Sequence, residues 1–449
     1  MKSPGTYFFE TYGCQMNSAE SSALERVLRE RGWEAAPQGN TADLVLLSTC
    51  SVRQTAETRL FGRLAQYQAL KKNLHREGKK PFTLVVSGCM ASRLGEKLKE
   101  DFSAVDYVVD TASRSILPRI LDALETGGTC TAPEEGAAFS FSSFHLEEGA
   151  FRSFLPIMHG CNNFCSYCIV PYVRGREVSR DPASIAEEIA LLARRGVREI
   201  TLLGQNVNSY RWENLDFSGL LRRIAGYLEG TSIERVRFLS ANPRNFSPET
   251  AAVMAEHPCF CRHLHLPVQH GSNRVLGAMN RRYTRESYLA LTEELRRAMA
   301  NISFSTDILV GFPGETEEEL EETLDLMAQV KFLHAYMYHF NPREGTAAFS
   351  LPRRIPEALK RERLGRVIAL QKQHTVELLQ ARLGSTERIL IEGISRKNAE
   401  ELIGRTERDE MVVIPRGNVQ AGTFVEAVLV SLRGNTFRGR LLCPGGSLD

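Results

Sequence analysis

Short apolar runs alternate with longer amphipathic stretches near the start of the chain. The apolar runs cover residues 7–13, 43–47 and 82–86, and the stretches with apolar positions at helical spacing cover residues 18–31, 54–74 and 92–99. Repeated strand-then-helix units are typical of a parallel sheet covered by helices. The pattern therefore predicts an N-terminal α/β domain.

The same alternation resumes in the middle of the chain. We predict strands at 154–158, 199–203, 235–239, 263–266, 305–310 and 334–339, and helices at 184–195, 217–228, 285–299 and 316–330. Six strand-helix units are too few to close an eight-stranded barrel. They predict a partial (βα)6 barrel that is open on one side.

The end of the chain changes to short alternating strands, which predict a small all-β barrel. These strands lie at 388–391, 410–414, 423–430 and 437–442. Between the first two parts, residues 127–150 lose all periodicity and are rich in Gly, Ala, Ser and Glu. We therefore expect a first domain at 1–130, a linker at 131–150, a central domain at 151–378 and a last domain at 379–449.

Charge gives little information about partners. The chain of 449 residues has a formal net charge of +2, so the whole-chain charge does not predict nucleic-acid binding. One helical stretch at 351–380 is locally basic, and either phosphate contact or a solvated face would explain it. Its basic residues are Arg353, Arg354, Lys360, Arg361, Arg363, Arg366 and Lys372.

The sequence carries no membrane signal that we recognise. The first residues have no apolar core of a signal peptide, and no apolar run is long enough to span a bilayer. We therefore expect a cytoplasmic protein without a membrane partner. In that reducing compartment, ten cysteines indicate metal or redox chemistry more than disulfides.

Three of these cysteines, Cys161, Cys165 and Cys168, lie in one short loop directly after a predicted strand. Three thiolates can hold three irons of a [4Fe-4S] cubane and leave the fourth iron open for a substrate or cofactor. A structural zinc site is the alternative. Its fourth ligand would have to come from His159 or from the distant pair Cys259 and Cys261.

Three further cysteines, Cys14, Cys50 and Cys89, each follow one of the first three predicted strands. Any one of them alone would be interpreted as a small, buried apolar side chain. Parallel strands deliver their carboxyl ends to the same edge of a sheet, so together they predict a second cluster site with three thiolates. The four cysteines with no such placement, which we expect to be structural, are Cys130, Cys259, Cys261 and Cys443.

Polar residues near the carboxyl ends of the central strands are candidates for cofactor contact. They are Gln205, Asn206, His265, Gln269 and Asp307. The segments 269–272 and 311–315 would line the open face with them. Each has a plain alternative, since such residues also satisfy backbone groups or hydrogen-bond one another inside strands.

Several segments resemble a known family. The cysteine spacing of the loop resembles the radical S-adenosylmethionine (SAM) enzymes, and the match to their methylthiotransferases, in particular the MiaB branch, extends over nearly the whole chain. The matching segments are Tyr12-Gly-Cys-Gln-Met-Asn17, Thr49-Cys-Ser-Val-Arg53, Gly88-Cys-Met-Ala91, residues 160–177 and Leu203-Gly-Gln-Asn-Val-Asn-Ser-Tyr210. Residues 392–397 and 402–406 resemble the TRAM domain, an RNA-binding module. Ser48 and His270 depart from the family pattern, where Asn and Ser are usual.

The resemblance implies a reaction. Enzymes of this branch attach a methylthio group to carbon 2 of an isopentenylated adenosine beside the anticodon in tRNA. The cluster on Cys161, Cys165 and Cys168 would bind SAM and generate a deoxyadenosyl radical. The auxiliary [4Fe-4S] cluster on Cys14, Cys50 and Cys89 would supply sulfur, and a second SAM the methyl group. The implied partners are the tRNA anticodon stem-loop and a low-potential, flavodoxin-like reductant, and we expect a monomer.

Two alternatives stay open at this point. Related branches modify a threonylcarbamoyl adenosine in tRNA or an aspartate of a ribosomal protein. A more distant possibility is a non-catalytic iron–sulfur protein that binds RNA and senses redox state.

Overall fold

The computed structural model describes residues 4–51, 54–111, 116–128, 130, 141 and 149–442. Most of the predicted linker and Cys443 therefore lie outside the described residues. Within the described ranges, no helix combines the length and apolar character needed to cross a membrane.

The N-terminal part is a five-stranded parallel sheet in the order β2-β1-β3-β4-β5. The strands are β1 Thr6–Tyr12, β2 Glu34–Ala35, β3 Leu44–Thr49, β4 Thr83–Gly88 and β5 Tyr107–Val109. All six residues of β3 are buried, as expected of a central parallel strand covered on both faces. The two unpredicted strands, β2 and β5, are too short to show a hydrophobic period.

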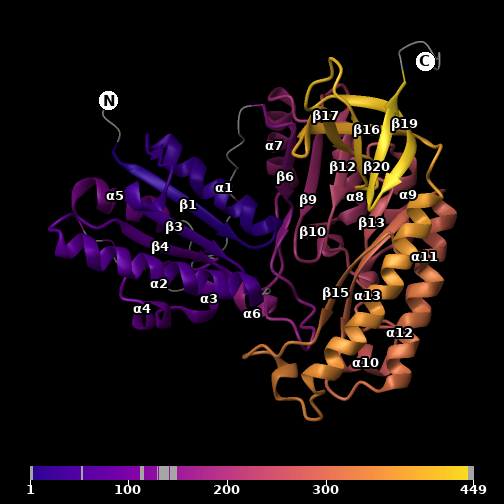
Figure 1. Cartoon of the computed structure of the whole chain (residues 1–449), viewed down its shortest axis with the longest axis horizontal. Helices are drawn as coiled ribbons and strands as arrows, with labels where there is room; N and C mark the ends of the chain where they lie inside the picture. Colours follow the sequence, from indigo (N-terminus) through magenta and orange to yellow (C-terminus); the bar gives the residue numbers. More distant parts are fainter. Residues whose placement is uncertain are drawn as a thin grey trace.

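Helices cover both faces of this sheet (Figure 1). They are α1 Gln15–Glu30, α2 Gln54–Arg76, α3 Cys89–Leu94, α4 Lys97–Asp101 and α5 Leu117–Thr126. The single helix predicted at 92–99 is wrong. Two short helices replace it because Gly95, at φ +53°, interrupts the helix, and the first of them already begins at Cys89.

The central part contains six strands in two three-stranded parallel sheets. One consists of β6 Arg152–Pro156, β9 Glu199–Leu203 and β12 Arg235–Phe238, and the other of β13 His263–His265, β14 Ser303–Val310 and β15 His334–His339. A parallel bridge between Val236 and Phe260 joins them, and the backbones of Cys259 and Cys261 provide its hydrogen bonds. The strand predicted at 154–158 ends early, because Met158–His159 (β7) pairs instead with Val178–Ser179 (β8).

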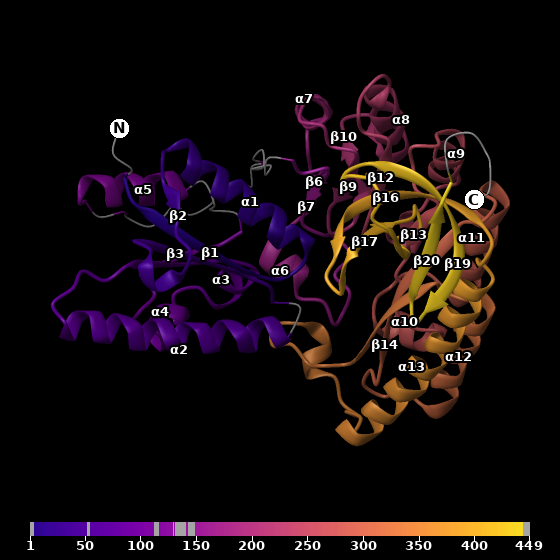
Figure 2. The same cartoon turned by 45° about the horizontal axis from the view of Figure 1, so that its top comes forward.

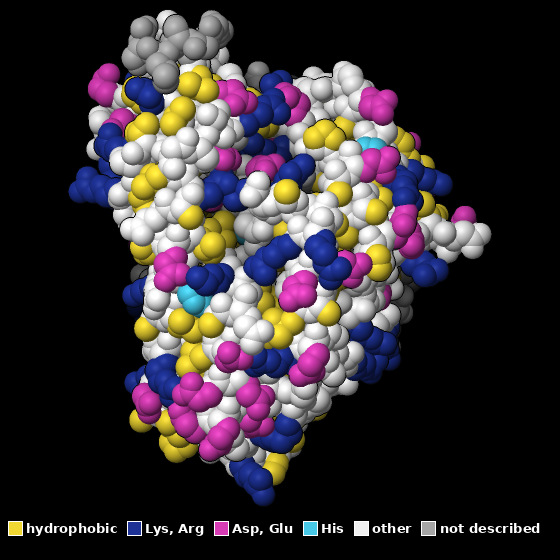
Figure 3. Space-filling view, turned by 90° about the vertical axis from the view of Figure 1, so that its right-hand side faces the viewer, with side chains coloured by type: hydrophobic (Ala, Val, Ile, Leu, Met, Phe, Trp, Pro, Cys, Tyr) yellow, Lys and Arg dark blue, Asp and Glu magenta, His cyan; other side chains and the backbone are white. Residues whose placement is uncertain are grey.

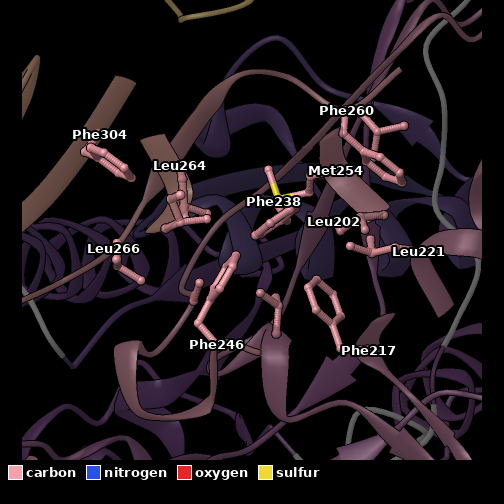
Figure 4. Packing of buried hydrophobic residues seen from close by; sticks show 14 of the residues in the cluster. Leu202, Phe217, Leu221, Phe238, Phe246, Met254, Phe260, Leu264, Leu266 and Phe304 are labelled. Carbon is pink, nitrogen blue, oxygen red and sulfur yellow. The ribbon is translucent and has the colours of Figure 1, made fainter. Parts of the chain in front are cut away.

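Helices pack on the outer side of these sheets. They are α7 Pro182–Arg194, α8 Phe217–Leu228, α9 Pro248–Glu256, α10 Asn273–Ala278, α11 Arg285–Ala298, α12 Glu317–Val330 and α13 Glu357–Gln380. Figure 4 shows Phe217 and Leu221 of α8 packed against Leu202 and Phe238 of the strands. The rings of Phe217 and Phe238 meet edge to face, with centroids 5.2 Å apart. The large apolar core thus lies between sheet and helices, and it leaves the inner strand faces to polar residues.

The C-terminal strands close into a barrel in the order β16-β17-β18-β20-β19. Their bounds are β16 Thr386–Ser395, β17 Asn398–Arg405, β18 Met411–Pro415, β19 Phe424–Arg433 and β20 Thr436–Leu441. We did not predict β17, whose first residues, Asn-Ala-Glu-Glu, are too polar to indicate a strand.

Two arginines of β12 fix this barrel to the central sheets. Arg235 donates to the carbonyls of Arg405 and Arg388 at 3.2 and 3.0 Å, and Arg237 donates to those of Glu407 and Thr406 at 2.6 and 2.8 Å. Figure 2 shows the barrel lying over the strands of the central part. Because both guanidinium groups are buried while bonded, the barrel is a firmly docked unit.

The basic stretch at α13 does not form a phosphate-binding surface as a whole, which corrects one of our two readings. Lys360 and Arg363 are buried, where they donate to the Phe340 carbonyl at 2.9 Å and to Glu315 at 2.8 Å. Arg366 is ion-paired with two glutamates of α12. In Figure 3, which faces this side of the molecule, Lys and Arg side chains are interspersed with Asp and Glu.

Replacing Phe437 by Ala should destabilise the C-terminal barrel. Phe437 is fully buried in the barrel core, and removing such a side chain costs about 3–5 kcal/mol. Chemical denaturation should measure this loss in the free energy of unfolding. Val430→Ala is the control, since Val430 is 49% exposed on the same barrel and its replacement should change stability by about 0.5 kcal/mol or less.

Candidate active site

The loop from Cys161 to Cys168 is held by hydrogen bonds from several elements. Ser166 bonds the end of α10, through its amide to the Met279 carbonyl at 3.0 Å and through its hydroxyl to the Ala278 carbonyl at 2.8 Å. The Asn280 amide donates to the Phe164 carbonyl at 2.9 Å. The three thiols therefore sit on a fixed loop, and an ordered metal site requires such a loop.

Burial disfavours a free thiolate at Cys161 and at Cys168 of this loop. Cys161 and Cys165 are buried, and burial raises the pKa of Cys161 and raises that of Cys168 to about 12. The buried guanidinium of Arg281 donates to the Cys165 sulfur at 3.3 Å. Because a metal deprotonates a ligating thiol outright, this donor set fits a metal cluster better than free nucleophilic thiolates.

Gln205 and Asn206 contact the residues that flank this loop. The Gln205 side chain accepts from the Gly160 amide at 2.6 Å, directly before Cys161. The Asn206 amide donates to Glu177 at 3.0 Å, and Glu177 in turn accepts from the Asn162 backbone at 3.1 Å. Asn206 Oδ1 is buried and has no hydrogen-bond partner among the described residues. Gln205 therefore supports the loop, while Asn206 keeps one acceptor for a bound molecule.

His265, Gln269 and Asp307 lie near one another on β13, β14 and the turn after β13. His265 Nε2 is 3.7 Å from Asp307 Oδ2, and its Nδ1 is 3.0 Å from the Ser305 hydroxyl. The backbone of Gln269, at φ +71°, bonds to Asp307 at 2.9 Å and to Leu309 at 2.8 Å. The structure thus gathers these three predicted residues on the carboxyl half of the second sheet.

Two polar segments that we expected to line the open face instead build a buried network. His270 is completely buried, with its Nε2 at 3.2 Å from Glu315 Oε2. Glu315 also accepts from the Gly311 amide at 2.7 Å. The carboxylate satisfies the donors of the turn at 311–315, so this turn and His270 are structural.

Cys14, Cys50 and Cys89 meet at the carboxyl edge of the N-terminal sheet. Cys14 caps the start of α1, Cys50 follows β3, and Cys89 opens α3 after β4. A hydrogen bond from the Cys50 thiol is the largest influence on Cys14, and it outweighs burial to lower the pKa of Cys14 to about 6. The adjacent thiols and this stabilised thiolate fit a thiolate-bound metal cluster.

Small side chains allow these cysteines to come together. Gly88 has φ +90°, and a Cβ at this position would lie 2.6 Å from the Thr49 carbonyl oxygen. Asn17 bridges the two neighbouring segments, since its oxygen accepts from the Cys14 thiol at 3.2 Å and its amide donates to the Thr49 carbonyl at 3.2 Å.

The elements that carry the two sets of cysteines pack against one another. Met16 and Ala19 of α1 pack on Leu203 at the end of β9, with Cys14 beside them. On the other side, the short helix α6, Val170–Arg174, follows Cys168 and packs against α3, which carries Cys89. Figures 1 and 2 both show α6 beside α1 and α3.

Across the ranges that the structure describes, no group of three His, Cys, Asp or Glu side chains is arranged to hold one metal ion.

Sequence reasoning missed four residues that shape the site: Arg174, Glu177, Asn280 and Arg281. Arg174 and Glu177 lie inside the segment that resembles the family, so their closeness in sequence to Cys168 could have identified them as site residues. Asn280 and Arg281 lie more than a hundred residues further along the chain, and only the fold brings them to the loop.

Three family models match the chain. The Radical SAM superfamily matches residues 155–327, the uncharacterized protein family UPF0004 matches residues 6–110, and the TRAM domain matches residues 380–442. The three matches fall on the central sheets, the N-terminal sheet and the C-terminal barrel, respectively.

Curated relatives match over nearly the whole chain, and each is named tRNA-2-methylthio-N(6)-dimethylallyladenosine synthase. The protein from Treponema pallidum subsp. pallidum is 48% identical, covering 97% of this chain and 99% of the relative. The one from Bacteroides fragilis is 40% identical over 96% and 94%, and the one from Moorella thermoacetica is 38% identical over 98% and 99%.

Solved structures share the fold. The radical S-adenosylmethionine methyltransferase TsrM from Kitasatospora setae aligns with a TM-score of 0.58 at 16% identity, over 78% of this chain and 77% of that chain. The cobalamin-dependent S-adenosylmethionine radical enzyme OxsB aligns with a TM-score of 0.52 at 12% identity, over 82% and 56%.

Replacing Gly160 by Ala should disrupt the cysteine loop. A Cβ at Gly160 would fall far inside contact distance of the Arg176 carbonyl oxygen, and its φ of +78° already disfavours a side chain. We expect the iron content after anaerobic reconstitution to fall by about the amount of iron that the cysteine loop binds.

Gly127→Ala is the matched control, because Gly127 has φ +73° in the left-handed helical region and open space around its Cβ position. That variant should lose only the ~1–2 kcal/mol of a left-handed residue and keep its iron. Equal iron in both variants would contradict the importance of this close approach.

Proposed function

Because the chain belongs to the family of the tRNA-2-methylthio-N(6)-dimethylallyladenosine synthases, we propose that it adds a methylthio group to carbon 2 of N6-isopentenyladenosine beside the anticodon in tRNA. The chain is a radical SAM enzyme. The observation that carries the proposal is that two sets of three cysteines follow strands of two different sheets, and that the elements carrying them pack against one another.

The proposal assigns one [4Fe-4S] cluster to each set. Cys161, Cys165 and Cys168 would hold the cluster that binds SAM. The cluster of the second set, at residues 14, 50 and 89, would be the auxiliary, sulfur-bearing one. When bound, these groups supply the electron for SAM cleavage and the sulfur for insertion, and two SAM molecules are consumed per product. Three thiolates per set leave one iron open in each, as both roles require.

The chain's own residues orient this chemistry. Gln205 and Glu177 hold the backbone on either side of Cys161, and Arg281 places a positive charge beside Cys165. We propose that Asn206, whose buried oxygen lacks a partner in the described part, binds SAM. We assign the same role to the cluster of His265, Gln269 and Asp307.

The remaining assignments complete the proposal. The two central sheets would form one open (βα)6 barrel in a domain at 151–378, flanked by domains at 1–130 and 379–449. The TRAM barrel would bind the anticodon stem-loop, where unstacked bases contribute about 1–3 kcal/mol each by stacking. We also propose a cytoplasmic monomer that receives electrons from a flavodoxin-like donor.

Nucleoside mass spectrometry tests the substrate and the reaction together. Isopentenylated tRNA is incubated anaerobically with reconstituted protein, reductant and SAM, and its nucleosides are then analysed. We expect the mass of a methylthio group to appear on isopentenyladenosine. Release of deoxyadenosine without this mass gain would support the radical chemistry and contradict the proposed substrate.

Replacing cysteines by Ala should separate the two sets. Loss of Cys161, Cys165 or Cys168 should abolish deoxyadenosine release, because the SAM site is destroyed. Loss of Cys14, Cys50 or Cys89 should preserve that release and abolish methylthio transfer. Chromatography of deoxyadenosine and of modified nucleosides measures both. Equal loss of SAM cleavage in the two sets would contradict the assignment.

A further inference from the structure

Helix α6 belongs to the central part by sequence but lies against the N-terminal part. It begins two residues after Cys168, and its last residue is Arg174. Ile169 and Val173 pack against Cys89, and the Thr111 hydroxyl donates to the Val173 carbonyl at 2.7 Å. The segment that follows one cysteine set thus forms a wall of the other.

Arg174 makes a bidentate ion pair across this junction. Its Nη1 and Nη2 lie 2.6 and 3.1 Å from the two carboxylate oxygens of Glu20, and both side chains are buried. Glu20 stands on α1, the helix that Cys14 caps. The pair therefore connects the helix that follows Cys168 to the helix that follows Cys14.

This ion pair lies beside the second cysteine set. Val173, the residue before Arg174, packs against Cys89, and Glu20 lies on the helix that Cys14 caps. The guanidinium of Arg174 is therefore a buried positive charge close to this set, and the carboxylate of Glu20 is the negative charge paired with it.

Stability alone does not explain a buried ion pair at this place. Desolvation of both charges offsets most of their attraction, and apolar side chains of similar size fill such positions equally well. The reduction potential of an iron–sulfur cluster, by contrast, responds directly to nearby charge and to hydrogen bonds that its sulfur ligands accept. A guanidinium beside Cys89 stabilises the more negative, reduced state of a cluster bound there.

We infer that Arg174 is a positioning residue that raises the reduction potential of the cluster on Cys14, Cys50 and Cys89, and that Glu20 limits this effect. This inference rests on the proposed function, because it assumes that the second set holds an iron–sulfur cluster. It goes further by giving the residue between the two sets a role in controlling the auxiliary centre.

The inference is tested by the direction in which each substitution shifts the reduction potential of the cluster. Arg174→Gln removes the positive charge and should lower the potential, whereas Glu20→Gln removes the negative charge and should raise it. We would measure both by redox titration of the cluster signal in electron paramagnetic resonance. The full chain would carry Ala at residues 161, 165 and 168, so that one cluster gives the signal.

Opposite shifts support the inference. Shifts of equal sign, or none, overturn it and leave Arg174 a structural residue. Because Arg174→Gln removes the guanidinium that pairs with the buried carboxylate of Glu20, that variant is also made on the Glu20→Gln background, where this carboxylate is absent. On this background, Arg174→Gln must again lower the potential.

Arg343→Gln is the matched control. Arg343 also crosses between the central and N-terminal parts, with its Nη1 at 2.8 Å from Glu57, which is also paired with Arg93. Among the described residues, Arg343 is not one of the groups that most strongly affect the pKa of Cys89. This variant should lower the melting temperature and leave the potential unchanged. A shift equal to that of Arg174→Gln would overturn the inference.

The outcome is separable from that of the proposed function. The titration needs no tRNA and no turnover, so the opposite shifts can appear even if isopentenyladenosine gains no methylthio group. Conversely, a methylthio gain together with unchanged reduction potentials in the variants would support the proposed function and contradict the role of Arg174 in setting the potential.

Discussion

The edge at which parallel strands end is the constraint on which the rest of this structure depends. A parallel sheet sends all its carboxyl ends to one side, so whatever follows each strand meets there. Cys50 and Cys89 follow neighbouring strands, and Cys14 follows the strand on the other side of β3. The cysteine loop of the central part follows its first strand in the same way. The elements at these two edges pack against one another, with Leu203 beside Cys14 and with Val173 of α6 on Cys89.

Contacts between the parts hold those edges in place, and they are largely polar. Arg235 and Arg237 bond backbone carbonyls of the C-terminal barrel. Glu20 with Arg174, and Glu57 with Arg343, connect the N-terminal sheet to the central part at separate places. Directional bonds of this kind fix orientation more strictly than apolar contact does, because a small rotation breaks them. Such strictness would suit the two cluster sites that we propose, because both would act on one substrate.

The two faces of the central sheets differ in their side chains, and the outer face provides most of the apolar packing. The outer faces bury Leu, Ile, Val and Phe against helices and provide most of the apolar burial. The inner faces carry His265, Ser305 and Asp307, which bond one another at the level where a ligand would enter. Polar groups can occupy those positions because the core on the other side already stabilises the sheet.

The sequence by itself determined the two cysteine sets, the three structural parts and most strands and helices, because hydrophobic period and cysteine spacing are local properties. The positions of Gln205, Asn206, His265, Gln269 and Asp307 within or near the strands were also predictable, since strand ends can be located from the pattern, and their contact with a cofactor stays a prediction. It did not determine β2, β5 or β17, which are too short or too polar to show a period. Nor did it reveal that His270 and Glu315 turn inward, or that Arg281 and Arg174 reach the two cysteine sets. Those outcomes depend on which distant segments pack together, and only the tertiary structure decides that.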